Sequence, residues 1–460
     1  MKMKKYLLLF VAALALGFAS CSDDETIPNL TGIAIESEGG VTEVIQGGTL
    51  ALTANYTSNV NPEVRWEVNG EVKSTDKEFS FTEAEPGKYY VTLVVSTDVG
   101  EKRVNLPVTV YGKYKYGTFV LNEGNFGNPP SSLIFISPEN EMTEAAYFEA
   151  NGTHLGVVSQ DLFIANNKMY IISQNGGEDG MLVIANAETL KKEKGFSKDQ
   201  LADLNWPTHV AALDDSHVYI RDINWPTHVA ALDDSHVYIR DNNGVHLFDP
   251  TTTSLSLIEG TDGAIKNRMA VTAQKVFAGT NNSLLVIKDN KVIKTIALEG
   301  TPTGVVKASD GNVWVSVNST PAKIMKVSSK DYSILKTNEL GSFQVSAGWG
   351  ATPAISAKGD SIYFGNNSTT IYLHDFAKNQ TKELAKIGDY IQNATMTYNN
   401  LAVNPKNSDV YVTTIKGYGN DYLTNSIGVF NFTSGTTKLV QDYKNATRFP
   451  AGVFFTYDFE

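Results

Sequence analysis

Residues 304–335, GVVKASDGNVWVSVNSTPAKIMKVSSKDYSIL, decide the fold because they contain several short apolar strands in succession. Residues 304–308 are followed by 312–317, 323–327 and 332–335, with polar or glycine-containing turns between them. Short apolar runs that alternate with polar residues and end in turn residues indicate β-strands. Four such strands form one small sheet, and a series of these sheets predicts a β-propeller.

The same pattern recurs weakly along residues 115–460. Its first strands begin near residues 155, 226, 268, 302, 352, 399 and 450, mostly about 34 to 52 residues apart, which is the spacing of propeller blades. Residues 450–455 look like a first strand without companions, and residues 117–122 look like a second strand without a first. Together they would complete one blade and remove the free edge of the ring. We predict seven blades, with six or eight as alternatives.

One segment of the propeller region is duplicated. Residues 205–222 recur without change as residues 224–241. Neighbouring blades normally diverge, so this identity indicates a very recent tandem duplication or an assembly error in the sequence. The copy is half a blade long, and we expect an extruded loop or an extra hairpin. The repeat contains four of the seven histidines, so their number is no metal signature: His209, His217, His228 and His236.

Residues 30–112 read as a separate β-sandwich. Short alternating strands are separated by turns at regular intervals, and Trp66 falls in a middle strand, where such folds bury a large aromatic ring. Residues 86–100 resemble the last strands of a PKD-type domain. We find no catalytic constellation here and expect a spacer. The fold class we predict is therefore all-β, an immunoglobulin- or PKD-like sandwich followed by a seven-bladed propeller.

The first 20 residues predict a lipoprotein signal peptide. Three lysines precede an apolar run, and small residues lead to Cys21, which is the only cysteine. Residues 18–21 resemble the lipobox of bacterial lipoproteins, although Phe18 departs from the usual leucine. The alternative is an ordinary signal peptide with an incidental cysteine. We expect Cys21 to be acylated, so that lipid chains anchor the protein to a membrane.

An acidic tether over residues 21–29 follows. Its tetrad at residues 22–25, SDDE, resembles the surface-export signal of Bacteroidetes lipoproteins, and the alternative is a solvated linker. The resemblance implies a lipid-anchored protein of the outer membrane, exposed at the cell surface.

Composition and motifs narrow the function. A net charge of −12 argues against nucleic acid as a partner, because phosphate binding needs clustered lysine and arginine. With its cysteine acylated, the chain has no disulfide, thiolate metal site or cysteine nucleophile. The sequence contains no nucleophile elbow, zinc-binding helix motif or phosphate-binding loop. We therefore expect a protein that is not an enzyme, with no cofactor, no metal and no catalytic residues.

The loops that enter each first strand, and those that join each second strand to the third, share one face of a propeller. Here they are rich in asparagine, glycine and aromatic residues, which suits a large, neutral, amide- or sugar-rich ligand. Asparagine and glycine also simply form tight turns. The candidate ligand-binding residues are Asn125, Phe126, Gln174, Asn175, Trp225, Arg240, Arg268, Trp349, Asn366, Tyr418, Tyr422 and Arg448.

Residues 122–127, NEGNFG, follow a strand and precede the blades. This arrangement resembles the YncE-like, DUF5074-type propeller lipoproteins of Bacteroidetes and is similar to the BtuG-type cobalamin-binding proteins. The resemblance implies a surface protein that captures a corrinoid (vitamin B12) and hands it to a TonB-dependent outer-membrane transporter. Two alternatives stay open, a glycan-binding or adhesive surface protein and a propeller lyase or hydrolase.

Overall fold

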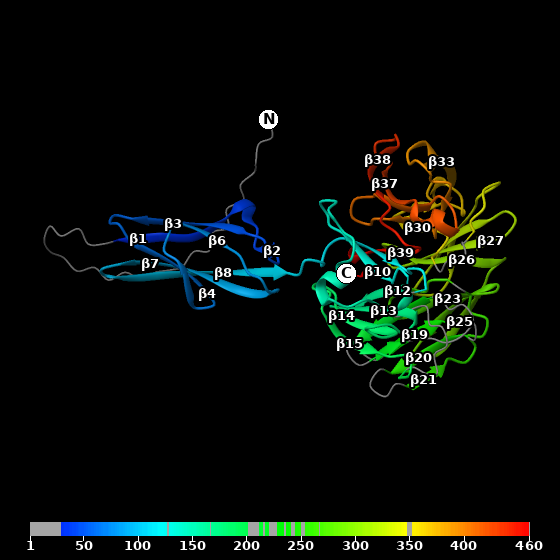
Figure 1. The fold of residues 1–460 in the computed structure, drawn as a ribbon, viewed down its shortest axis with the longest axis horizontal. Helices are drawn as coiled ribbons and strands as arrows, with labels where there is room; N and C mark the ends of the chain where they lie inside the picture. Colours follow the sequence, from blue (N-terminus) through cyan, green and yellow to red (C-terminus); the bar gives the residue numbers. More distant parts are fainter. Residues whose placement is uncertain are drawn as a thin grey trace. The chain divides into compact units, whose positions relative to one another are not determined.

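The computed structural model describes residues 29–126, 128–165, 167–200, 211–214, 217–219, 228–233, 236–240, 244–249, 254–265, 267–346 and 352–459. The expected signal peptide, Cys21 and all but the last residue of the expected tether lie outside this range. The chain divides into two compact units, residues 1–115 and 116–460 (Figure 1). The helices in the described ranges are all too short or too polar to span a bilayer.

The first unit is a sandwich of two sheets. One sheet has the strand order β1-β3-β6 and the other has the order β2-β8-β7-β4-β5. The strands are β1 (Leu30–Ser37), β2 (Glu43–Ile45), β3 (Leu50–Ser58), β4 (Glu63–Val68), β5 (Glu71–Ser74), β6 (Glu78–Phe81), β7 (Gly87–Thr97) and β8 (Gly100–Tyr111), with the 3-10 turn η1 (Glu38–Gly40) after β1.

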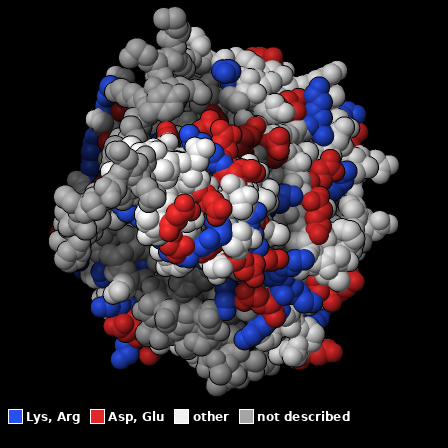
Figure 2. Space-filling view, turned by 90° about the vertical axis from the view of Figure 1, so that its left-hand side faces the viewer, with Lys and Arg blue, Asp and Glu red and all other residues white. Residues whose placement is uncertain are grey.

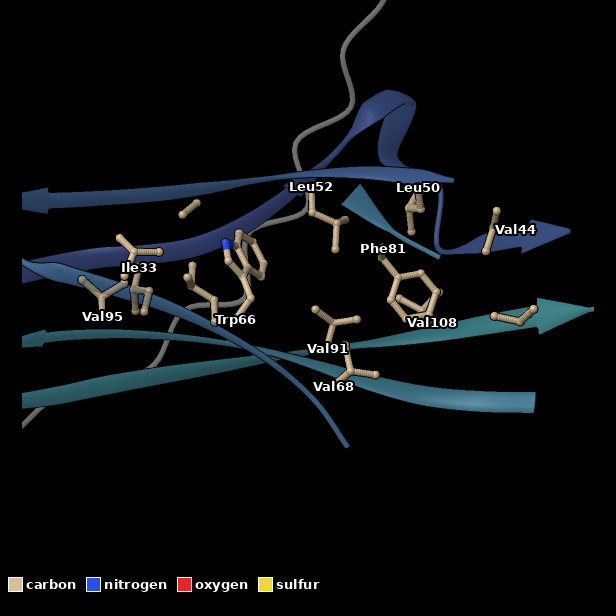
Figure 3. Close-up of a cluster of buried hydrophobic side chains, with 14 of the residues drawn as sticks. Ile33, Val44, Leu50, Leu52, Trp66, Val68, Phe81, Val91, Val95 and Val108 are labelled. Atoms are coloured by element: carbon tan, nitrogen blue, oxygen red, sulfur yellow. The ribbon is translucent and has the colours of Figure 1, made fainter. Parts of the chain in front are cut away.

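Aromatic and aliphatic side chains from both sheets form the core of this sandwich (Figure 3). Trp66 is fully buried, as the sequence predicted, and its ring stacks on Phe79 with centroids 5.5 Å apart. Its indole Nε1 atom donates to the Asp76 carbonyl oxygen at 2.9 Å. The polar end of the ring is thus satisfied, so the whole side chain can be buried without an unpaired donor.

The second unit consists of small antiparallel sheets of the kind that the sequence predicted. In the described residues, six sheets have four strands and one has five. Three of the sheets are complete blades formed by one continuous stretch of chain. The first has β22 (Ala270–Thr272), β23 (Lys275–Thr280), β24 (Ser283–Lys288) and β25 (Lys291–Ala297), and the next has β26 (Thr301–Lys307), β27 (Val313–Asn318), β28 (Lys323–Val327) and β29 (Ile334–Glu339). The third has β30 (Ser356–Lys358), β31 (Ser361–Phe364), β32 (Thr370–Asp375) and β33 (Gln380–Lys386).

Two further blades flank the point where the ring closes. The second blade has β12 (Val157–Ala165), β13 (Lys168–Asn175), β14 (Leu182–Asn186) and β15 (Lys192–Phe196). The last blade has β34 (Met396–Thr397), β35 (Ala402–Val403), β36 (Val410–Ile415), β37 (Asn425–Asn431) and β38 (Lys438–Lys444). Short helical turns lie between blades or within loops: α1 (Ala146–Asn151), η2 (Ile387–Asp389) and η3 (Gly419–Leu423).

Both ends of the second unit build the closing blade. Its strand order is β11-β10-β9-β39, from β9 (Thr118–Asn122), β10 (Ser132–Ile136), β11 (Met142–Thr143) and β39 (Pro450–Phe455). Strand β39 pairs antiparallel with β9, with Phe455 opposite Thr118. The Gly117 backbone N–H also donates to Thr456 Oγ1 at 3.0 Å, in the terminal turn η4 (Thr456–Phe459). The described sheets confirm the prediction of an all-β chain with seven blades.

The duplicated segment forms two equivalent hairpins. The first copy contributes β16 (Ala211–Asp214) and β17 (His217–Tyr219), and the second contributes β18 (His228–Asp233) and β19 (His236–Arg240). Ala211 pairs with Tyr219 in the first hairpin, as Ala230 pairs with Tyr238 in the second. Only the second hairpin continues into β20 (Val245–Asp249) and β21 (Ser254–Leu257) to complete a blade. The first copy is therefore an extra hairpin.

Candidate ligand-binding site

The alternation of antiparallel strands places particular loops at one end of the ring. In each blade, the loop into the first strand and the loop from the second strand to the third lie at the same end. Around the closing blade these are residues 123–131, 144–156, 416–424 and 445–449. We call the surface formed by these four loops the loop face.

Backbone hydrogen bonds hold two of these loops together. The Glu123 N–H donates to the Phe449 carbonyl at 2.8 Å, and the Gly124 N–H donates to the Arg448 carbonyl at 3.0 Å. The Arg448 N–H donates in turn to Asn122 Oδ1 at 3.0 Å. Because these bonds extend the β39–β9 ladder beyond the strands, the side chains on both loops are held in fixed positions.

Gly124 shapes the first loop. Its φ of +74° is in the left-handed region, and a Cβ at this position would meet the Pro129 carbonyl oxygen at 2.6 Å. Only glycine fits such a position without strain. The turn leaves Asn125 exposed and Phe126 with 75% of its surface open to solvent. The Phe126 ring therefore adds little to the packed core, and an exposed apolar ring marks a contact surface when other exposed apolar residues lie near it.

Beside this loop lies a stack of three aromatic rings. The ring of Tyr422 stacks on Phe449 with centroids 4.4 Å apart, and Tyr398 packs against Phe449 at 5.2 Å. Burial raises the pKa of Tyr398, so its hydroxyl keeps its proton and donates to Glu123 Oε1 at 3.3 Å. Tyr418, which precedes η3, stays 61% exposed. The stack supports the surface, and Tyr418 presents a ring to solvent.

A pocket of about 200 Å³ opens between three of these loops. Its walls include Pro130 from the first loop, Arg448 from the last, and a group from the segment around α1, namely Glu144, Tyr147 and His154. Pockets that enclose a whole drug-sized ligand have ~300 Å³ or more. This pocket is therefore large enough for one small chemical group and too small to enclose a whole ligand of that size.

A buried carboxylate fixes the segment around α1. Asp179, which follows β13, accepts hydrogen bonds from the Tyr147 hydroxyl at 2.7 Å and the Thr153 hydroxyl at 2.5 Å, and it forms an ion pair with Lys192. Burial alone would raise the pKa of Asp179, but these hydrogen bonds outweigh it and lower the pKa. The carboxylate stays charged and ties α1 to the second blade.

The structure brings part of the predicted site together. Arg448, Tyr418, Asn125 and Phe126 lie on the loop face. Tyr422 shares the same end but is only 7% exposed, so its ring packs inside the loop face. Trp225, Trp349 and the side chain of Arg240 lie outside the described residues.

Arg268 points into the ring and not onto the loop face. Its guanidinium carbon lies 4.8 Å from the centre of the Phe454 ring, and its Nη2 atom lies 3.8 Å from Asp161 Oδ1. Strand β39 bears Phe454 and β12 bears Asp161, so Arg268 crosses from its own blade to two others. Asp161 is 4% exposed, and burial raises its pKa well above the usual range although Arg268 opposes the shift.

Three other candidate residues lie in a turn or at the end of a strand. Asn366 has a φ of +49° in the turn between β31 and β32, a conformation that asparagine tolerates well. Gln174 and Asn175 end β13, where Asn175 pairs with Val157 and its Oδ1 atom accepts from Lys198 at 3.5 Å. These residues are half-buried.

Several loop asparagines bond neighbouring blades to one another. The Asn399 amide donates to the Pro450 carbonyl at 2.7 Å, and the Asn400 amide donates to the Pro353 carbonyl at 2.7 Å. The Asn267 amide also donates to the carbonyl of Thr303 in the next blade. The asparagine content that indicated an amide-binding surface therefore serves, at these positions, to hold the ring together.

Sequence reasoning missed the segment around α1. Residues 144–156 were not among the predicted entry loops, and this segment begins with the helix α1 in place of a tight turn. The apolar pair Tyr147 and Phe148 was its only signal: Tyr147 is buried, and Phe148 is 41% exposed.

The charges of the described surface are mixed. Figure 2 shows acidic and basic side chains interspersed in one view of the molecule. Within the described ranges, no group of three or more histidine, cysteine, aspartate or glutamate residues is placed to hold a metal ion.

A comparison with solved structures finds one with the same architecture. The chain is similar to a quinoprotein alcohol dehydrogenase-like protein from Bacteroides thetaiotaomicron, with a TM-score of 0.52 and 16% identity over 90% of this chain and 96% of that chain. At this identity the likeness shows the fold alone. A second match is apo AztD from Citrobacter koseri, with a TM-score of 0.42 and 12% identity over 74% and 96% of the two chains.

Family models cover both units, although no curated protein matches the chain. A PKD-like domain matches residues 32–97, in agreement with the predicted sandwich. A domain of unknown function, DUF5074, matches residues 116–456, nearly the whole propeller. The chain therefore belongs to the DUF5074 family and carries a PKD-like domain ahead of the family's propeller.

Proposed function

We propose that this protein is a non-enzymatic binding protein that captures a corrinoid on the loop face of its propeller. The observation that carries the proposal is the pair of exposed rings, Phe126 and Tyr418, on the same loop face as a pocket that three of its four loops line. Rigid aromatic side chains supply large contact area at low entropic cost. A corrinoid is a large macrocycle with many uncharged amide arms, which suits such a surface.

The distribution of exposed apolar residues supports this location. Among the described residues of the propeller, Phe126, Phe148, Tyr418 and Leu423 are exposed and lie on the loop face. The other large exposed apolar residues include Ile293, Ile334 and Leu335, which lie on the fourth strands of continuous blades. Apolar residues gathered on loops mark interaction sites more often than single residues on outer strands.

The expected N-terminal anchor completes the proposal. Acylation of Cys21 would hold the protein at the outer membrane, with the PKD-like domain as a spacer. The partner we propose there is a TonB-dependent transporter that receives the corrinoid. The acidic residues 22–25 are consistent with export to the cell surface.

Calorimetric titration of the soluble chain, residues 22–460, with cyanocobalamin tests the proposal. We expect one-to-one binding that the double substitution Phe126→Ala/Tyr418→Ala weakens by about 10- to 30-fold. Aromatic side chains at an interface are among the residues that contribute most to the binding free energy. Leu335→Ala, which removes an exposed apolar side chain from β29, serves as the matched control and should bind normally. No heat with the unmodified chain would eliminate the corrinoid.

The exposed rings also favour a second candidate, a glycan, because flat aromatic side chains stack on sugar rings. An oligosaccharide array with the same three proteins separates the two. Binding to glycans that requires Phe126 and Tyr418, with no response to cyanocobalamin, would establish the glycan in place of the corrinoid.

A further inference from the structure

Arg448 is fixed in an unusual way for a surface arginine. Its Nη1 atom donates to the carbonyl oxygen of Asn445 at 2.7 Å and to that of Thr447 at 2.6 Å. The residue is half-buried, and its backbone N–H is bonded to Asn122. The chain's own carbonyls therefore hold the guanidinium in one orientation, so little side-chain entropy remains to be lost when it binds a partner.

This guanidinium has no carboxylate partner in the described part of the chain. Arg65, Arg103 and Arg268 each lie within 4.0 Å of an aspartate or glutamate oxygen, whereas Arg448 does not. No described atom accepts a hydrogen bond from its Nε or Nη2 atom. These two atoms form one edge of the guanidinium, and they carry the parallel N–H bonds that match the two oxygens of a carboxylate or phosphate.

The other polar groups of the pocket are mostly engaged. Thr153 donates to Asp179, Ser131 donates to the Glu123 carbonyl, and Ser132 accepts from the Asn122 amide. The remaining ionisable lining groups are Glu144 and His154, both exposed. With Arg448 fixed and Glu144 at the rim, the pocket suits a group with one negative charge better than a group with two.

We propose that this pocket is a subsite for a singly charged oxyanion, held by the Nε and Nη2 edge of Arg448. The inference rests on the proposed function and names the group: the phosphodiester in the nucleotide arm of a complete corrinoid. The macrocycle then lies across Phe126 and Tyr418, and the phosphodiester enters the pocket. A ligand carboxylate has the same chemistry, and the test separates the two sources.

The experiment compares cyanocobalamin with cobinamide, a corrinoid without the nucleotide arm and its phosphate. We expect Arg448→Gln to weaken cyanocobalamin binding by about 10- to 100-fold, the loss of hydrogen bonds to a charged group. Cobinamide should bind the unmodified chain and Arg448→Gln equally. Arg448→Lys keeps the charge but not the paired N–H groups, so its affinity for cyanocobalamin should lie between those of the unmodified chain and Arg448→Gln. Lys438→Gln, which removes an exposed cation at the start of β38, should change neither ligand. If Arg448→Gln loses the same affinity for both corrinoids, or loses affinity for neither, the phosphodiester subsite is overturned.

A second arm keeps this inference separate from the proposed function. Millimolar dimethyl phosphate should raise the unfolding temperature of the unmodified chain, relative to sodium chloride of equal ionic strength, and should not raise that of Arg448→Gln. Acetate in place of dimethyl phosphate tests a carboxylate. If only acetate raises the unfolding temperature, the subsite binds carboxylates and the phosphodiester is overturned. If no corrinoid binds but dimethyl phosphate acts through Arg448, the proposed function fails and the oxyanion subsite stands. If neither binds, both fail.

Discussion

Arg268 and Arg448 occupy equivalent places in two blades and have different surroundings. Each lies two residues before its blade's first strand, β22 for Arg268 and β39 for Arg448. Arg268 turns into the ring, where it meets Asp161 and the Phe454 ring. Arg448 lines a pocket on the loop face and is held by carbonyls. The difference shows that position in a blade does not determine whether such a side chain is structural or available to a ligand.

The blades themselves explain the difference. The blade β22–β25 is one continuous stretch, and only residues 281–282 join its second strand to its third. In the closing blade, residues 123–131 make the same connection, and the first strand comes from the other end of the unit. The longer loops of the closing blade line a pocket on the loop face, and the closure of this blade depends on pairing between residues far apart in sequence.

Removal of residues 450–460 should have the largest effect. All six residues of β39 are buried, and loss of a buried phenylalanine side chain alone costs about 3–5 kcal/mol. Since a domain has only about 5–15 kcal/mol of net stability, we expect the truncated propeller to lose its cooperative unfolding transition in calorimetry. The sandwich has its own core and should still unfold as before. A truncated chain with the full-length transition would show that closure contributes little.

Phe455→Ala and Phe277→Ala test when each blade forms. Both side chains are almost fully buried, so each substitution should cost about 3–5 kcal/mol of unfolding free energy. The closing contacts join distant residues and should form late, so Phe455→Ala should mainly speed unfolding. Phe277, inside a continuous blade, should mainly affect the folding rate. Stopped-flow kinetics separate the two, and the same partition for both variants would refute late closure.

Substitution of the two arginines compares their roles directly. Arg268→Gln removes the cation near the buried Asp161 and should lower the unfolding free energy by about 1–3 kcal/mol. Arg448→Gln should lower it by about 1 kcal/mol or less, because it loses only two hydrogen bonds to backbone carbonyls, one of them on the exposed Asn445. Urea denaturation measures both. A larger loss for Arg448→Gln would make that residue the structural one.

The pH dependence of the terminal turn should be the smallest effect. Asp458 has part of its surface open to solvent, but protein atoms surround its carboxyl. This burial raises the pKa of the carboxyl to about 6, although the positive charges of Arg268 and Lys307 oppose the shift. Unfolded aspartate has a pKa of ~3.9, so between these values the folded chain binds more protons. The contribution of Asp458 to the free energy of unfolding is therefore complete below pH ~4 and is lost as the pH rises through about 6.

Asp458→Asn should remove that loss. We expect the variant to unfold at a higher temperature than the unmodified chain at neutral pH and at the same temperature near pH 4. A difference in unfolding temperature that is constant over this range would show that the carboxyl does not titrate as described.

The periodic features of the chain could be predicted from its sequence, but the interior of the ring could not. Strand patterning predicted β39 as an orphan first strand and Trp66 as a core residue, because each depends on local alternation of apolar residues. The inward turn of Arg268 depends on Asp161, more than 100 residues away, and on the diameter of the ring. The bonds from Asn399 to the Pro450 carbonyl likewise require two blades to be placed side by side. Local patterns carry no information of that kind.

Hydrogen–deuterium exchange of the soluble chain, with and without saturating cyanocobalamin, tests most directly whether the closing blade carries the binding site. We expect protection in residues 123–131, 144–156, 416–424 and 445–449, and unchanged exchange in the turn at residues 281–282 of the continuous blade. Protection confined to continuous blades, with the four loops unchanged, would contradict it.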